Sequence, residues 1–231
     1  KNQMATKTLR FIEDRLDTLI KQLDSVEHNR ENYKRQNDVI SLGDQAMVYF
    51  NNVKELDKIN STIELQLQIL DDVVNYVNAK GQKKGTVPSL ILINDETLKS
   101  LLTQLYDAEF NLDKVKTTAG NKSDLVILAE EKVIRIKDDI RENIKNIRNN
   151  FTLQKKSNER NISLNKNLYT SIPEKERGLL EISRQQEIKN NIYTYLLQKR
   201  EETALSSAST SADLRILEKG FYYGPVRPIP S

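Results

Sequence analysis

Hydrophobic residues recur every three or four positions along most of this chain, which is the spacing that places them on one face of an α-helix. The first stripe resembles a heptad seam in which Arg30 fills the one vacant position: Leu9, Ile12, Leu16, Leu19, Leu23, Val26 and Tyr33. So narrow a seam predicts a partner helix that lies almost parallel or antiparallel to it. A break between Asn37 and Gly43 ends this first helix.

A second helix is predicted from about Asp44 to Lys80, where two glycines and Pro88 end it. Its apolar stripe contains Leu56, Ile59, Ile63, Leu67, Leu70, Val74 and Val77. At about 1.5 Å a residue, this helix should be on the order of 50 Å long. The apolar run from Ser89 to Ile93 predicts either a short strand or the apolar packing of an ordered loop.

Two further helices are predicted in the middle of the chain. Asn94 is a good N-cap for one that continues to about Lys116. Its stripe contains Leu98, Leu101, Leu102, Leu105 and Phe110. Ser123 or Asp124 can cap the next helix. The stripe of that helix contains Val133, Ile136, Ile140, Ile144, Ile147 and Phe151, and its register is expected to continue through Leu164 and Leu168.

A fifth helix is predicted to start at Pro173, directly after a sharp stop, because proline fits the first helical turn but breaks a helix interior. We expect this helix to reach about Ser207. Its stripe contains Leu179, Ile182, Ile188, Ile192, Tyr195 and Leu196. The segment Ala208–Asp213 is expected to end it, and Leu214–Leu217 is expected to be extended.

Narrow apolar seams need neighbouring helices, and short connections make those neighbours antiparallel. The predicted fold class is therefore mainly α, an elongated antiparallel bundle of long coiled-coil-like helices with at most a short C-terminal β segment. The helical bundle is expected to cover residues 1–212, and residues 213–231 are expected to form an extended or strand segment. We expect the turns at residues 81–93 and 117–124 at one end of the bundle and both chain termini at the other.

Composition agrees with long helices and excludes some classes of function. Of the 231 residues only 37% are hydrophobic, with 7 glycines and 5 prolines, which suits helices that each bury one narrow stripe. The 36 Lys and Arg are nearly balanced by 33 Asp and Glu, which argues against a nucleic-acid-binding protein. The absence of cysteine excludes disulfides. Because the chain starts at Lys1 without a signal peptide or an apolar membrane span, we expect a segment excised from a longer protein.

No catalytic, cofactor-binding or metal-binding residues are predicted, so this segment is not expected to be an enzyme. His28 is the only histidine and is expected to face solvent. The chain contains neither a P-loop nor a Gly-x-Ser-x-Gly motif. Four tyrosines near the C-terminus are expected to be structural: Tyr193, Tyr195, Tyr222 and Tyr223.

The start of the fifth helix suggests a role in assembly. Glu174 and Glu176 complement the positive end of the helix dipole, whereas Arg177 is disfavoured there. A carboxylate from another helix or from a neighbouring subunit would offset that cost. Our hypothesis is that this block and the charged middle of the same helix supply assembly residues, namely Pro173, Glu176, Arg177, Arg200 and Glu201.

Two segments also carry a resemblance to a known family. The first helix contributes Thr8, Phe11, Ile12, Arg15, Leu16, Leu19, Leu23, Val26 and Glu27. The last helix contributes Pro173, Glu176, Arg177, Tyr193, Leu196, Leu197, Lys199, Arg200, Glu201 and Glu202, followed by Pro225, Pro228 and Pro230. In this order the chain resembles the periplasmic region of bacterial polysaccharide co-polymerases, and most closely the exopolysaccharide tyrosine autokinases (Wzc-like, chain-length determinant family). The match is best over residues 172–230, moderate over 5–37 and weak between them.

The resemblance implies a segment at the periplasmic face of the bacterial inner membrane, within a parent chain anchored by two flanking transmembrane helices. The second of these would follow residues 213–231. Such proteins form homo-oligomeric rings and control the length or export of capsular polysaccharide or exopolysaccharide. Their partners are a polysaccharide polymerase or an outer-membrane export channel, and glycan is a further candidate. The protein-tyrosine kinase would lie in a cytoplasmic domain of the parent, and no cofactor is implied for this segment.

Two other classes of protein remain open. A helical-hairpin periplasmic adaptor of an efflux or secretion system should carry a lipoyl-like β-sandwich rich in Gly and Val, and no such region is visible in the sequence. A structural coiled-coil tether is disfavoured by the ordered block from Ile172 to Pro230, especially its prolines. Apolar spans on both sides of the segment in the parent gene would favour the co-polymerase over the tether.

Overall fold

The computed structural model describes residues 2–79, 90–119 and 123–219. The chain forms these elements in order: α1 (Asn2–Asn37), α2 (Asp44–Asn78), the 3₁₀ turn η1 (Leu90–Leu92), α3 (Glu96–Ala119), α4 (Asp124–Ser163), α5 (Lys166–Ser171) and α6 (Glu174–Lys219). The mainly α fold expected from the sequence is confirmed, and the described residues contain no β-strand. Within these same residues, no helix has an apolar stretch long enough to cross a bilayer.

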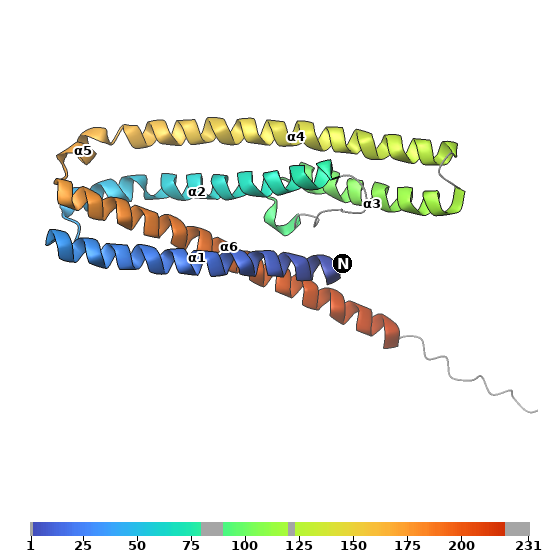
Figure 1. Ribbon diagram of the computed structural model, residues 1–231, viewed down its shortest axis with the longest axis horizontal. Coiled ribbons are helices and arrows are strands. Elements are labelled where there is room, and N and C mark those ends of the chain that lie inside the picture. The colour runs from blue at the N-terminus through green and yellow to red at the C-terminus, as the bar shows by residue number, and fades with distance from the viewer. Residues whose placement is uncertain (1, 80–89, 120–122, 220–231) are drawn as a thin grey trace, which may run out of the picture.

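The 40-residue α4 holds one side of the molecule together. Figure 1 shows α2 and α3 following one another along the long axis, with α4 running antiparallel beside both. Two hydrogen bonds and two ion pairs join α4 to α2 in one antiparallel register: Arg141–Asn78, Arg148–Asp71, Lys155–Glu64 and Asn158–Asn60. Two ion pairs continue the same arrangement between α4 and α3: Lys137–Glu109 and Lys116–Glu130.

The other side of α2 packs against α6, which in turn packs against α1. α6 runs parallel to α2 and antiparallel to α1, and it crosses α1 obliquely (Figure 1). Its last turns extend beyond the N-terminal end of α1. The first and last helices of the chain are therefore direct neighbours along most of the length of α1.

Two groups of buried side chains form the core. The larger one draws on every helix except α5, and its most buried members include Ile12, Val73, Leu98, Leu105, Ile140 and Leu196. A smaller one lies where the α1–α2 turn meets the start of α6 and contains Ala46, Tyr49, Val53, Ile172 and Leu180. The chain thus buries one long seam and one compact end.

The single apolar stripe predicted for the second helix is wrong in part, because α2 has neighbours on two sides. Ile59 is 40% exposed, whereas the polar residues Asp57, Ser61 and Gln66 are buried. These polar side chains are hydrogen-bonded, as buried polar groups must be. Gln66, for example, donates its amide N–H to the carbonyl oxygen of Leu92 over 2.9 Å.

The apolar run before the third helix is an ordered loop and not a strand. η1 occupies it, and Leu92 and Ile93 are almost fully buried. The cap of α3 is one residue later than predicted. The carboxylate of Asp95 accepts the backbone N–H of Leu98 over 2.7 Å, so Asp95 takes the role expected of Asn94.

The prediction for the fourth helix is confirmed except at its end. Ser123 caps α4, with its Oγ accepting the backbone N–H of Leu125 over 3.1 Å. The stripe from Val133 to Phe151 packs into the larger core. The register stops at Ser163, because a short turn separates α4 from α5 and leaves Leu164 exposed.

The last helix extends farther than predicted, and the expected strand is absent. α6 reaches Lys219, so Leu214–Leu217 is helical and the expected boundary between residues 212 and 213 falls inside a helix. The segment Ala208–Asp213 contains no glycine or proline to end a helix, and the leucines and charged residues that follow are good helix formers. The predictions for residues 220–231 concern residues outside the described ranges.

The expected placement of the turns is also wrong. The α1–α2 and α4–α6 connections share one end of the molecule, and the α3–α4 turn lies at the other (Figure 1). The N-terminus lies partway along the bundle, and η1 lies near the middle. The physical reason is that α2 and α3 continue in one direction and do not form a hairpin, which places η1 between them and away from both ends.

Candidate functional site

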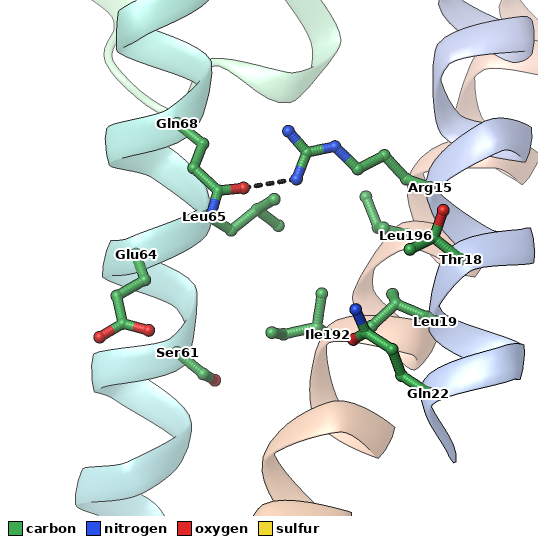
Figure 2. Close-up of a pocket in the computed structure, with 10 residues that line it drawn as sticks. All are labelled: Arg15, Thr18, Leu19, Gln22, Ser61, Glu64, Leu65, Gln68, Ile192 and Leu196. Atoms are coloured by element: carbon green, nitrogen blue, oxygen red, sulfur yellow. Dashed lines mark hydrogen bonds between the residues drawn. The ribbon is translucent and has the colours of Figure 1, made fainter. Parts of the chain in front are cut away.

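A cleft of about 190 Å³ opens between α1 and α2, with α6 behind it (Figure 2). One wall is formed by Arg15, Thr18, Leu19 and Gln22 of α1. The other wall is formed by Ser61, Glu64, Leu65 and Gln68 of α2, and α6 adds Ile192 and Leu196. The residues of each wall are three, one and three positions apart, which places all of them on one face of their helix.

The floor of the cleft is apolar. Leu19, Leu65 and Leu196 belong to the larger core and are each less than 10% exposed. Ile192 packs against the same core and points into the space between the walls (Figure 2). The polar side chains surround this floor, so the cleft combines an apolar floor with a rim that can form hydrogen bonds.

Arg15 is the cation that lines the cleft. Its guanidinium donates a hydrogen bond across the opening to the side-chain carbonyl oxygen of Gln68 (Figure 2) and lies 5.2 Å from the ring centre of Phe11. Burial raises the pKa of the neighbouring Asp72 carboxyl, while Arg15 lowers it and Asp71 raises it further. The hydrogen-bond acceptor of Arg15 is a neutral amide, and its charged neighbour is the exposed carboxylate of Asp72.

Two other rim residues are held by α6. Lys189 donates to the side-chain carbonyl oxygen of Gln22 over 2.9 Å, and Asn191 donates to the hydroxyl oxygen of Ser61 over 3.1 Å. With the carbonyl oxygens of Gln22 and Gln68 both accepting hydrogen bonds, their NH₂ groups are the ends available to a ligand. The rim is accordingly rich in N–H donors.

The wall residue Glu64 has its ion-pair partner outside the cleft. It forms an ion pair with Lys155 of α4 over 2.8 Å, and in Figure 2 its carboxylate lies on the side of α2 away from Arg15. Within the described residues, no group of three or more His, Cys, Asp or Glu side chains could hold a metal ion. The arrangement is suited to binding an acceptor-rich molecule on an apolar floor.

A buried ionic cluster lies toward the compact end of the bundle. Arg184 of α6 donates two hydrogen bonds to Asp57 of α2, over 2.8 and 2.9 Å, and two more to Glu181. These hydrogen bonds from Arg184 to Asp57 raise the pKa of the guanidinium further above its ordinary value. Tyr49 and Tyr169 pack beside the cluster with ring centres 5.1 Å apart. Because every charge has a partner, this cluster fixes the register of α6 on α2.

The predicted assembly residues at the start of the last helix make contacts within the chain. The carboxylate of Glu176 accepts the backbone N–H of Gly43, the N-cap residue of α2, over 3.1 Å. The guanidinium of Arg177 lies 5.8 Å from the ring centre of Tyr169. Pro173 is exposed, and its carbonyl oxygen accepts the first N–H bond of α6. This block joins α6 to the α1–α2 turn.

Arg200 and Glu201 differ from that block, because within the described part of the chain their side chains pair with each other alone, over 2.8 Å, and are 39% and 64% exposed. They lie about 24 residues farther along α6, so the structure does not bring the five predicted assembly residues together. His28 is exposed, as predicted. Tyr193 and Tyr195 pack against the larger core, and Tyr222 and Tyr223 lie outside the described residues.

Sequence reasoning did not identify the cleft, nor the Asp57–Arg184 cluster. One signal was available for the cluster: Asp57 and Ser61 are polar residues at helical spacing from apolar ones on α2, which indicates a buried polar contact when both flanks are apolar. No local signal marks the cleft, since its walls come from segments about 45 residues apart. Comparison with family models, with curated proteins and with solved structures finds no match for this chain.

Proposed function

We propose that this chain is the periplasmic scaffold segment of an inner-membrane polysaccharide co-polymerase. In this proposal it holds copies of the parent protein together and helps to control the length or export of capsular polysaccharide or exopolysaccharide. The parent would carry its tyrosine autokinase in a cytoplasmic domain. Further copies of the chain, a polysaccharide polymerase or an outer-membrane export channel, and glycan would be its partners.

The observation that carries this proposal is the pairing of α1 with α6. The resemblance to the co-polymerases is concentrated in two segments, residues 5–37 and 172–230, which are separated by more than 130 residues of weak similarity. In the structure the described parts of these segments pack along one another as α1 and α6. Resemblance that falls on one contiguous structural unit is better explained by common architecture than by chance matches in separate helices.

The shape of the molecule supports a scaffold. α4 is 40 residues long, which corresponds to about 60 Å at 1.5 Å per residue. The helices bury narrow seams and leave long charged faces outside, and faces of this kind suit contacts between rods. A scaffold of this type acts by positioning its partners relative to one another, which requires no catalytic residue.

Arg200 and Glu201 are the residues of the resemblance block best suited to contacts between subunits. Glu176 and Arg177 already have partners inside the chain, whereas the Arg200–Glu201 pair lies on the surface. An exposed ion pair contributes about 0–1 kcal/mol to stability. Changing it should therefore affect assembly more than folding.

The test is a charge reversal, Arg200→Glu, in the membrane-embedded parent protein. We expect a lower particle mass by light scattering in detergent and an altered length distribution of the polysaccharide in cells, because two neighbouring acidic residues would repel a complementary subunit. Lys58→Glu is the matched control, since Lys58 also sits in an exposed ion pair, with Glu55 on its own helix α2. The control should keep both the mass and the polysaccharide lengths of the unchanged protein.

An unchanged particle mass and unchanged polysaccharide lengths for Arg200→Glu would remove the assembly role of this pair. A parent protein that remains a monomer under all membrane-mimetic conditions would overturn the scaffold proposal itself.

A further inference from the structure

We infer that the cleft between α1 and α2 binds a single acidic sugar residue, with the sugar carboxylate on Arg15 and the sugar ring on the apolar floor. This inference rests on the proposed function, because it names the kind of polysaccharide unit that the segment would contact. Its physical basis lies in the size of the cleft, the chemistry of its floor and the charge of its rim.

The size of the cleft suits one sugar ring. Its volume of about 190 Å³ is many times the space that a single water molecule needs. That is too small for a folded segment of another protein and large enough for one six-membered ring with its substituents.

The floor suits the face of a sugar ring. A pyranose presents C–H groups on its faces and hydroxyl groups around its edge. The buried side chains of Leu19, Leu65 and Leu196 offer an apolar surface of matching polarity. A ring that lies on this floor directs its hydroxyl groups toward the polar rim. Hydrogen bonds to the rim side chains then take the place of those that the hydroxyl groups made with water.

The rim favours an acid over a neutral sugar. Arg15 can donate several N–H bonds, and its hydrogen-bond acceptor in the structure is the neutral amide of Gln68. The nearby Asp72 carboxylate is exposed to solvent and interacts with Arg15 only through its charge. A carboxylate accepts such bonds more strongly than an amide or a hydroxyl group does. The positively charged Lys189 lies behind Gln22, and the acidic wall residue Glu64 is already paired with Lys155. The amide N–H groups of Gln22 and Gln68 are placed to serve the remaining acceptors of the sugar.

The experiment is a titration of the ¹⁵N-labelled chain, followed by NMR, with three probes: D-glucuronate, D-glucose and acetate. We expect glucuronate to shift the amide signals of residues 15–22, 61–68 and 192–196 with an affinity in the millimolar range. Glucose should bind about tenfold or more weakly, because it lacks the charge-assisted bonds to Arg15. Acetate should also bind weakly, because it makes no contact with the floor.

Arg15→Met is the variant that removes the charge while it keeps an unbranched stem of similar length beside Phe11. We expect it to weaken glucuronate binding about tenfold or more and to leave the weak binding of glucose unchanged. Arg10→Met is the matched control, because Arg10 is an exposed arginine on the same helix and does not line the cleft. It should bind glucuronate like the unchanged chain. Gln68→Met, on the opposite wall, gives a second variant should Arg15→Met fail to fold, and it should also weaken binding.

Three outcomes overturn the inference: no shifts with glucuronate, equal binding of glucuronate and acetate, or shifts that fall outside the cleft. These outcomes leave the scaffold proposal standing, since assembly is measured on the parent protein by mass. Conversely, a monomeric parent whose cleft still binds glucuronate would retain the sugar site and lose the scaffold.

Discussion

At the scale of single residues, the molecule is stabilised by polar groups that are buried in pairs or in small networks. Tyr76 is an example, since it is only 6% exposed and its hydroxyl donates to Glu109 of α3 over 3.1 Å. Glu109 in turn pairs with Lys137 of α4 over 3.3 Å. Three helices therefore meet at the carboxylate of Glu109. The pKa of the Tyr76 phenol is raised by burial first and by the negative charge of Glu109 second.

This raised pKa predicts a loss of stability at alkaline pH. Below the ordinary tyrosine pKa of about 10, the folded and unfolded chains both keep the proton, and stability is complete. Above that pH the unfolded chain releases the proton while folded Tyr76 retains it, so stability falls by up to about 1.4 kcal/mol per pH unit. Tyr76→Phe should cost about 1 kcal/mol at pH 7 through the lost hydrogen bond and should flatten the decline above pH 10.

Urea unfolding followed by circular dichroism between pH 8 and pH 11 measures this difference. Tyr106→Phe is the matched control, because it removes an exposed phenol from the adjoining helix, and Tyr106 is the smallest of the causes that raise the pKa of Tyr76. Its stability should follow that of the unchanged chain over the whole range. A decline of equal steepness in Tyr76→Phe and in the unchanged chain would contradict the role assigned to Tyr76.

At the scale of helices, the close approach of α6 to α1 depends on a residue without a side chain. A Cβ atom added at Gly178 would overlap the hydroxyl oxygen of Tyr33 and its ring carbon Cζ. Glycine within a helix ordinarily costs about 1 kcal/mol relative to alanine. Here that cost is offset by the packing of the tyrosine ring over the helix backbone.

Gly178→Ala should therefore destabilise the chain by about 1–2 kcal/mol, because the half-buried ring of Tyr33 must move out of its site. In a Tyr33→Ala background the same substitution should stabilise the chain by about 1 kcal/mol, since only the gain in helix propensity remains. A double-mutant cycle measured by urea unfolding tests this change of sign. Gly178→Ala that stabilises both backgrounds would show that the two helices do not pack through this glycine.

The apolar stripes of the helices show how much of the fold the sequence predicts. The stripe of α4 from Val133 to Phe151 was predicted correctly, because that helix buries one face against α2 and α3. The stripe of α2 was predicted less well, since α2 packs on two sides and buries Asp57 where Ile59 was expected. The spacing of apolar residues predicts a single buried face, and the pattern becomes less clear when a helix buries two faces.

The cleft could not be predicted from sequence for a related reason. Arg15 and Gln68 are both ordinary surface residues by local pattern, and only the crossing of α6 behind α1 and α2 brings them to one opening. The assembly hypothesis for Glu176 and Arg177 was drawn from the same kind of local pattern. It recognised that Arg177 needs a partner but could not show that the ring of Tyr169, in the same chain, lies beside it.

At the scale of the whole molecule, the two ends of the bundle differ in how many helices support them. The larger core ends near Ala108 on α3 and Val133 on α4, and beyond these residues the hairpin consists of two helices alone (Figure 1). Several large apolar side chains in or next to that hairpin end are about half exposed or more: Phe110, Leu125, Ile127, Leu128 and Ile134. Fewer buried contacts per turn make this end less stable than the middle of the bundle.

Native-state hydrogen exchange should therefore resolve two levels of opening. Amides of residues 110–119 and 123–132 should exchange through a local opening with a small dependence on urea, whereas amides near Val73 and Leu196 should require global unfolding.

Val126→Ala, outside the larger core, should speed exchange only in the hairpin end. Ile140→Ala, inside that core, should lower the global free energy of unfolding by about 2–5 kcal/mol and speed exchange everywhere. Equal effects of the two variants on all amides would mean that the bundle unfolds as a single unit, and the two-helix end would then have no independent motion to offer a binding partner.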